Sequence, residues 1–203
     1  AYGVFMGMKA AAKHKFGSNI LEDKTVYVQG VGHVGESLVE HLTNEGAKVV
    51  ITDINQERLN QVSKKYGASI YTGNNIYAEK MDIYAPCALG ATVNDDTIYK
   101  LQAKVIAGAA NNQLALEDKH GVILQERGIV YAPDFLINAG GIINVYAELE
   151  GYDKHEIMRK TENIYNTTLE ILESAVKNGI TTNHAAMNIA KNRIEERKRA
   201  NSN

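Results

Sequence analysis

A glycine-rich turn between an apolar strand and a helix constrains the fold of this sequence more than any other segment. Val26–Gln29 leads into Gly30-Val31-Gly32-His33-Val34-Gly35, and a helical pattern begins at His33. In such a turn the first glycine permits the tight bend, the second lets a pyrophosphate approach the backbone, and the third lets helix and strand pack closely. The helix N-terminus adds unpaired N–H groups and a partial positive charge. Together these features predict a dinucleotide site.

An acidic residue, Asp53, closes the second apolar strand, Val49-Val50-Ile51-Thr52. A carboxylate at this strand end accepts hydrogen bonds from the adenosine ribose and repels a 2′-phosphate, which predicts NAD rather than NADP. A turn that only connects strand to helix would explain the glycines, but it would leave this carboxylate unexplained. The coenzyme contacts expected from the turn and the second strand are Gly30, Val31, Gly32, His33, Val34, Gly35, Asp53 and Ile54.

Six strand-like segments alternate with helical patterns. They are Thr25–Gln29, Lys48–Asp53, Ala68–Tyr71, Met81–Ala85, Lys104–Ala107 and Ile129–Tyr131. This alternation predicts an α/β fold with a parallel sheet covered on both faces. Two mononucleotide halves predict the doubly wound (Rossmann) order 3-2-1-4-5-6, with the ligand at the carboxyl ends of the strands.

Helices are expected before, between and after these strands, with additional helices at the C-terminal end. The first expected helix ends at Gly17, and the second runs from His33 to about Glu45 with Val34, Leu38 and Leu42 on one face. The third is capped by Asn55, turns Leu59 and Val62 inward and ends at Gly67; a short one from Asn94 through Leu101 and one around Leu124 follow. The C-terminal helices are one over Asn138–Glu150, a single long one over Asp153–Lys177 that is opened by Asp153 with Glu156 and ended by Gly179, and one from Thr182 into Arg193–Arg199. The mixed charges of that last segment favour a solvated face over a binding patch.

Charge and composition exclude several classes of protein. With 22 basic and 24 acidic residues, the net charge of −2 gives no general attraction to nucleic acid or anionic lipid. We find no apolar run near the ~20 residues of a membrane helix and no signal peptide. The single cysteine, Cys87, cannot form an internal disulfide, which suits a cytoplasmic location. The six histidines lack metal-binding spacing, so no metal is expected.

Three loops should converge on the coenzyme because they follow the fourth, fifth and sixth strands. They are Ala85–Gly90, Ala107–Asn112 and Ala132–Gly141, and their small residues, Ala109 among them, would let a flat ring approach the backbone. Asn111 and Asn138 suit a carboxamide, although both could instead satisfy loop backbone or cap helices. Cys87 is expected to be a small buried thiol beside the coenzyme rather than a nucleophile.

Catalytic groups are missing from these loops. Hydride transfer from an amino or hydroxy acid needs a general base and usually a cation for the carboxylate. No lysine or histidine follows a strand end in the expected cleft. The chain also opens at Ala1 without methionine, already in a helical pattern. We therefore expect further residues to precede Ala1 and to carry the chemistry.

Five ordered motifs identify a resemblance to a known family. They are Gly30–Gly35, Thr52–Asn55, Ala85–Gly90, Asn111–Leu114 and Tyr131–Val145. They resemble the coenzyme domain of the Glu/Leu/Phe/Val amino-acid dehydrogenases, and the resemblance runs from Ala1 to the last helix. It implies an NAD-binding domain over residues 1–203, flanked by interdomain helices near the hinge.

The family resemblance also implies an activity. It is NAD-dependent oxidative deamination of an L-amino acid to a 2-oxo acid and ammonium, by hydride removal from the α-carbon and lysine-assisted attack of water on the imine. The two active-site lysines and the catalytic aspartate would lie in an N-terminal domain that these residues lack, so no catalytic residue is assigned here. The resemblance adds Cys87, Asn111 and Asn138 to the coenzyme contacts and implies a homo-oligomer.

The segment from Leu136 to Ile142 would edge the pocket for the substrate side chain. Its expected lining residues are Leu136, Asn138, Ala139 and Ile142. Bulky apolar residues there favour a branched aliphatic side chain such as that of L-leucine. A pocket that discriminates by methylenes gains only ~1–3 kcal/mol for each, so other branched-chain amino acids should react too. The alternatives are a phenylalanine- or valine-selective dehydrogenase, and a non-catalytic dinucleotide sensor acting through the C-terminal helices.

Overall fold

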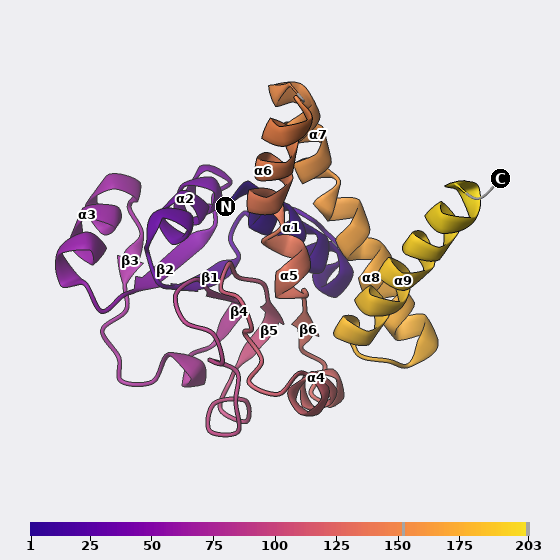
Figure 1. Ribbon diagram of the computed structural model, residues 1–203. Coiled ribbons are helices and arrows are strands. Elements are labelled where there is room, and N and C mark those ends of the chain that lie inside the picture. The colour runs from indigo at the N-terminus through magenta and orange to yellow at the C-terminus, as the bar shows by residue number, and fades with distance from the viewer. Residues whose placement is uncertain (152, 202–203) are drawn as a thin grey trace.

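A six-stranded parallel sheet forms the centre of the computed structural model, which describes residues 1–151 and 153–201. The strands are β1 (Thr25–Gln29), β2 (Lys48–Thr52), β3 (Ser69–Ile70), β4 (Met81–Pro86), β5 (Ala103–Ile106) and β6 (Val130–Tyr131). Their order is β3-β2-β1-β4-β5-β6, which confirms the predicted doubly wound topology (Figure 1). In the central register, Val28 lies opposite Ile51 on one side and Ala85 on the other.

The helices begin and end largely where local chemistry predicts. They are α1 (Tyr2–Phe16), α2 (His33–Asn44), α3 (Gln56–Tyr66), the short 3₁₀ helix η1 (Ile76–Ala78), α4 (Glu117–Glu126), α5 (Asp134–Ile137), α6 (Gly140–Glu150), α7 (Lys154–Glu162), α8 (Ile164–Asn178) and α9 (Thr182–Asn201). Asn55 caps α3 by accepting from Arg58 N–H at 3.0 Å, and Asp153 caps α7 by accepting from Glu156 N–H at 2.8 Å. Gly17, Gly67 and Gly179 end their helices in the left-handed conformation.

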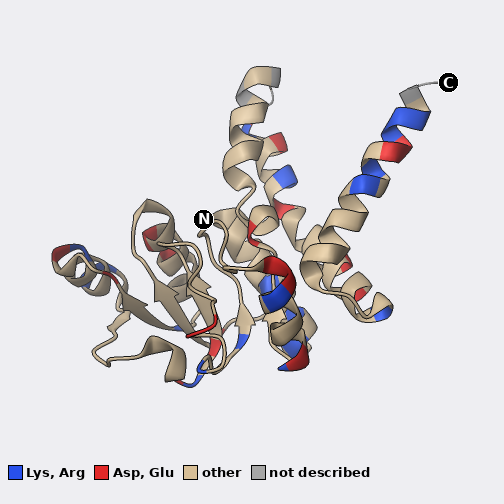
Figure 2. Ribbon diagram, turned by 60° about the horizontal axis from the view of Figure 1, so that its bottom comes forward, with Lys and Arg blue, Asp and Glu red and all other residues tan. Residues whose placement is uncertain are grey.

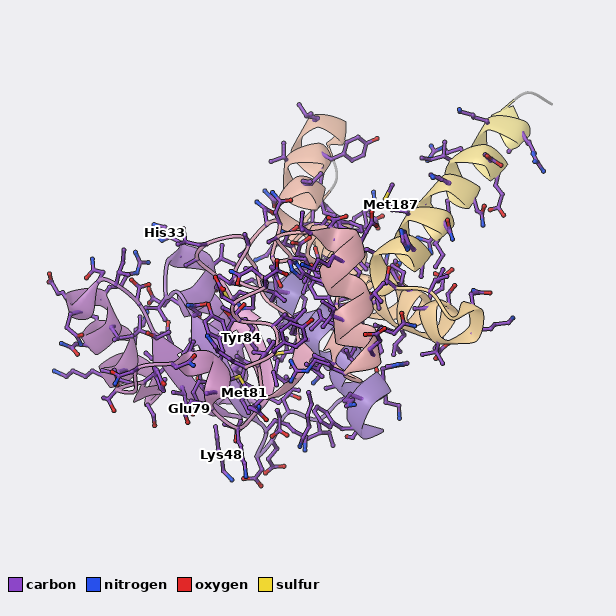
Figure 3. All side chains as sticks on the ribbon, turned by 90° about the horizontal axis from the view of Figure 1, so that it is seen from below. His33, Lys48, Glu79, Met81, Tyr84 and Met187 are labelled. Atoms are coloured by element: carbon purple, nitrogen blue, oxygen red, sulfur yellow. The ribbon has the colours of Figure 1, made fainter. Side chains whose placement is uncertain are left out.

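The two faces of the sheet bury different clusters because strand side chains alternate. Val26 and Val28 face the side covered by α1, α2 and α3, where Leu38, Leu42 and others complete the core. On the opposite side, Tyr84 and Ile106 pack with residues of α4 and of the turn before β5. Tyr84 is fully buried and donates a hydrogen bond to Gln29, and Figure 3 shows it in the interior. Burial on both faces is what a parallel sheet requires.

The C-terminal helices extend the fold beyond the sheet. α8 packs along α1, whereas α6 and α7 form a hairpin that projects from the body of the molecule (Figure 1). Four apolar side chains of α6 are exposed at helical spacing: Ile142, Val145, Tyr146 and Leu149. The far half of α9 carries intermingled basic and acidic residues (Figure 2), and its Arg193 pairs with Glu170 at 2.5 Å.

Two expected helices differ in the structure. The segment Asn94–Leu101 forms turns rather than a regular helix. Asn94 Oδ1 accepts from Asp96 N–H and Thr97 N–H as an N-cap does, but the backbone bonds that follow alternate between three-residue and four-residue spacing. The expected helix over Asp153–Lys177 is interrupted at Asn163, which separates α7 from α8. The Asn163 side chain accepts from Asn166 at 3.1 Å, a local bond that suits a helix boundary.

Two further expectations need correction near the predicted coenzyme loops. α5 occupies Asp134–Ile137, so Asn138 ends this short helix, and α6 begins two residues later than expected, at Gly140. Val34 does not share the buried face of Leu38 and Leu42, since its side chain is 44% exposed. None of the helices in the described part of the chain combines the length and apolar character that crossing a membrane requires.

Candidate functional site

The glycine turn after β1 leaves one end of α2 accessible. Gly30 has φ of +101°, and its N–H donates to Thr52 O at 2.7 Å, which ties the turn to the end of β2. Gly32 is the N-cap of α2, supplies no side-chain cap, and has no atom within 4 Å of where a β-carbon would lie. The first-turn N–H groups of α2 are therefore available to an anion. At Gly35, by contrast, a β-carbon would meet Gly30 O, so only glycine lets α2 pack this closely.

Asp53 binds this turn to the start of α3. Its Oδ2 accepts from Val31 N–H at 2.8 Å, and its Oδ1 accepts from Asn55 N–H at 2.8 Å. A carboxylate has about four lone-pair sites, so each oxygen can still accept from a ribose hydroxyl. Ile54 is fully exposed at the rim. The open space at Gly32 and the anchored carboxylate at Asp53 fit a dinucleotide coenzyme.

The two predicted carboxamide partners lie side by side. Asn138 Nδ2 donates to Asn111 Oδ1 at 2.6 Å and weakly to Ala109 O at 3.4 Å. Both asparagines line a cavity of about 420 Å³ with Val34, Ala109, Ile137 and Ile142, among others. Because the pairing uses the Asn111 carbonyl and the Asn138 N–H, their other amide groups remain for a ligand. Asn138 thus donates to loop backbone, which was the alternative to a ligand-binding role, and it also lines the cavity.

Two buried residues that sequence reasoning missed hold these loops in place. Gln113 is fully buried, and its Nε2 donates to Gly108 O at 2.8 Å and to Ala110 O at 2.9 Å. The Gln113 N–H donates to Asp134 Oδ2 at 2.8 Å, and Asp134 is also buried. This network joins the loop after β5 to the start of α5. A glutamine and an aspartate in loops have no periodicity that predicts burial.

Cys87 and His33 occupy different positions at this end of the sheet. Cys87 is half-buried, and its N–H donates to Gln29 O at 2.8 Å. Burial raises the pKa of its thiol to about 11, so the sulfur stays protonated at neutral pH. His33 is exposed, and Figure 3 shows it at the periphery of the molecule. Within the described ranges, no three His, Cys, Asp or Glu side chains gather as metal ligands do.

A profile of the Glutamate/Leucine/Phenylalanine/Valine dehydrogenase family matches residues 51–201. The chain belongs to this family. A second profile, of shikimate/quinate 5-dehydrogenases, matches residues 10–88, the part that holds the glycine turn and β1 to β4. For the Glu/Leu/Phe/Val dehydrogenases, the family and the doubly wound sheet together imply a nicotinamide dinucleotide as cofactor.

Relatives within the family include enzymes for different amino acids. The chain is 54% identical over 202 residues to leucine dehydrogenase of Bacillus cereus, covering all of this chain and 55% of that protein. It is 46% identical over 201 residues to valine dehydrogenase of Streptomyces coelicolor, covering 97% of this chain and 54% of that protein. The crystal structure of L-tryptophan dehydrogenase from Nostoc punctiforme superimposes with a TM-score of 0.93 at 45% identity, over 97% of this chain and 59% of that one. The chain therefore spans little more than half the length of these relatives.

The four expected substrate-lining residues are divided by the structure. Asn138 and Ile142 line the cavity, and the Ile142 side chain is 73% exposed on α6. Leu136 packs instead against buried residues of α8 and α9, and neither it nor Ala139 is among the described lining residues. Ile137, which belongs to the same expected segment, borders the cavity, but its side chain is fully buried and packs against Gly7 of α1. In a run of apolar residues, nothing in the sequence distinguishes those that pack into the core, as Leu136 and Ile137 do, from one that is exposed at the cavity, as Ile142 is.

Proposed function

We propose that residues 1–203 form the C-terminal coenzyme-binding domain of an NAD-dependent dehydrogenase that oxidatively deaminates L-leucine and other branched-chain L-amino acids. The observation that carries the coenzyme assignment is the Asp53 carboxylate, which is held against the glycine turn by Val31 N–H. Identity of 54% to a leucine dehydrogenase supports the amino-acid substrate. The branched-chain preference is supported by the exposed Ile142 side chain at the cavity.

In the proposed complex, each element of the site has a separate task. Gly32 and the first turn of α2 bind the diphosphate, and Asp53 accepts from the ribose hydroxyls and selects the unphosphorylated sugar. Asn111 and Asn138 bind the carboxamide and so orient the ring face. The nicotinamide coenzyme, when bound, supplies the acceptor for the hydride of the substrate α-carbon. Cys87 remains a neutral lining group.

The remaining chemistry is assigned to other parts of the full-length protein. We infer that an N-terminal domain supplies two lysines and an aspartate for substrate binding and proton transfer, as the family resemblance implies. α1 and the α7–α8 segment would flank the hinge, whose closure would exclude water. We also propose that the full-length protein is a homo-oligomer located in the cytoplasm.

Steady-state kinetics of the full-length protein test this function. Reduction of NAD⁺ should depend on an L-amino acid, and kcat/KM should be higher for leucine and valine than for phenylalanine. The 203-residue chain, if folded by circular dichroism, should bind NAD⁺ without turnover. Turnover by that chain would refute the assignment of the catalytic residues to an N-terminal domain, and a preference for phenylalanine would refute the branched-chain assignment. NAD⁺ binding with no amino-acid dependence in the full-length protein would favour a dinucleotide sensor instead.

A further inference from the structure

Glu36 lies between two cations beside the predicted ribose site. It follows Gly35 in the first turn of α2, and its carboxylate reaches across to α3. Oε1 is 3.0 Å from Lys65 Nζ, and Oε2 is 3.7 Å from Arg58 Nη2. Tyr66 OH also donates to Oε1 at 3.4 Å. The Lys65 ammonium holds the pKa of Glu36 below its ordinary value, so the carboxylate is ionised at neutral pH.

Arg58 is attached to the same segment as Asp53. Its N–H donates to Asn55 Oδ1 at 3.0 Å, and Asn55 N–H in turn donates to Asp53 Oδ1 at 2.8 Å. The Arg58 Nε is buried and has no hydrogen-bond partner among the described residues. A hollow of about 340 Å³ lies here, lined by Glu36, Asn55, Glu57, Arg58 and Gln61. Arg58 therefore has an unpaired donor close to Asn55, and Asn55 in turn anchors the Asp53 carboxylate that is expected to bind the ribose.

These observations concern the choice between coenzymes. In dinucleotide-binding folds, an acidic residue at the end of the second strand binds the ribose, whereas an arginine nearby accommodates a 2′-phosphate. A guanidinium suits phosphate because its planar fork donates two parallel hydrogen bonds. This chain has both the carboxylate of Asp53 and the arginine of Arg58, so a further group must decide whether the arginine is available.

We propose that Glu36, which also pairs with Lys65, is a specificity-determining residue that holds Arg58 against α2 and so withholds its guanidinium from a ribose 2′-phosphate. The inference rests on the proposed function, since it concerns the coenzyme of that same site. Asp53 repels the 2′-phosphate directly, and Glu36 removes the positive charge that could compensate. The two carboxylates should therefore act together, and changing either one alone should give only part of the effect.

Calorimetric binding of NAD⁺ and NADP⁺ to the full-length protein tests this coupling. Asp53→Ser should strengthen NADP⁺ binding about tenfold. Adding Glu36→Gln should strengthen it at least fivefold more, because Arg58 is released. Arg58→Ala in the double variant should cancel that second gain. The gain should shrink as salt rises, because the new contacts are between charges. NAD⁺ binding to the parent protein, measured in the same series, tests the proposed function separately.

Glu156→Gln is the matched control, because Glu156 of α7 also lies between two cations, Arg159 and Lys160. Its side chain is 31% exposed against 27% for Glu36, and both substitutions change the charge equally. The control should leave the NADP⁺ affinity of Asp53→Ser unchanged. If Glu36→Gln also leaves it unchanged while NAD⁺ still binds, the inference is wrong.

Arg58→Gln in the Asp53→Ser background provides a test if Glu36→Gln does not fold. With Glu36 intact, Arg58 should contribute nothing to NADP⁺ binding, so the affinity should stay within twofold. A loss of fivefold or more would show that Arg58 was available all along and would overturn the inference.

Discussion

Two alanine substitutions in the glycine turn should separate the packing role of the turn from its binding role. At Gly35 the β-carbon would stand 2.0 Å from Gly30 O, whereas a carbon and a carbonyl oxygen require about 3.3 Å. α2 and the end of β1 would have to separate by about 1.3 Å. Overpacking costs ~1–3 kcal/mol, and the upper part of that range, ~2–3 kcal/mol, applies here because the clash is with a backbone oxygen; alanine returns ~1 kcal/mol of helix propensity. We therefore expect Gly35→Ala to destabilise the fold by about 1–2 kcal/mol.

Gly32→Ala is the matched substitution three residues earlier. Gly32 has φ of −61° and ψ of −173°, which alanine adopts without strain, and its β-carbon would meet no atom within 4 Å. Stability should therefore change little. The methyl group would instead enter the space expected for the diphosphate, and NAD⁺ affinity should fall about tenfold, or ~1.4 kcal/mol.

Thermal unfolding and calorimetry of the full-length protein measure both effects. For a domain of this size, ~1 kcal/mol lowers the melting temperature by about 2–4 °C, so Gly35→Ala should melt about 2–8 °C lower. Gly32→Ala should melt within about 2 °C of the parent. The reasoning is refuted if Gly35→Ala melts like the parent protein, or if Gly32→Ala binds NAD⁺ as the parent does.

Three further substitutions test the loops and one ion pair. Gln113→Leu leaves Gly108 O and Ala110 O without their buried donor, at ~1–3 kcal/mol each, and should lower both the melting temperature and NAD⁺ affinity; unchanged affinity would mean that Gln113 does not position the Asn111 loop. Cys87→Ala should keep kcat within threefold because the thiol pKa of about 11 leaves it uncharged, and a hundredfold loss would reveal a nucleophile. Partial burial alone would raise the pKa of Asp82, but hydrogen bonds from Thr25 N–H and Lys104 hold it below its ordinary value. The stability that the ionised Asp82 gives to the fold is therefore complete above about pH 4 and is lost as pH falls through the lowered pKa. The melting temperature of Asp82→Asn should fall less steeply below pH 4 than that of the parent protein. Parallel curves of melting temperature against pH would contradict this.

The sheet was predictable because its strands are separated by strong local signals. The helices between strands begin and end with their own local chemistry, such as the Asn55 cap and the left-handed Gly67 that bound α3 and the left-handed Gly46 before β2. Once the order of elements was known, the doubly wound topology left few choices. The interruption at Asn163 is hard to predict because the apolar stripe continues across it and the residue keeps a helical backbone conformation, with φ of −66° and ψ of −11°.

The geometry of the candidate site could be predicted where it depends on backbone and strand ends, and less so where it depends on loop packing. Gly30, Gly35 and Asp53 follow from their positions relative to β1, α2 and β2. The position of Val34 fits both the apolar face of α2 and the expected coenzyme contacts, and only the structure shows that it is exposed at the cavity lined by Asn111 and Asn138. Gln113 is buried only because two loops distant in sequence meet over it, and that juxtaposition has no local signature.

The exposed edge of α6 has a practical consequence for work with the 203-residue chain alone. The α6–α7 hairpin, which projects from the body of the molecule, carries an exposed apolar surface formed by Ile142, Val145, Tyr146 and Leu149. Exposed apolar surfaces of this kind promote self-association in water. We expect the isolated chain to sediment as larger species when concentrated, and dilute samples or mild detergent should keep it monodisperse.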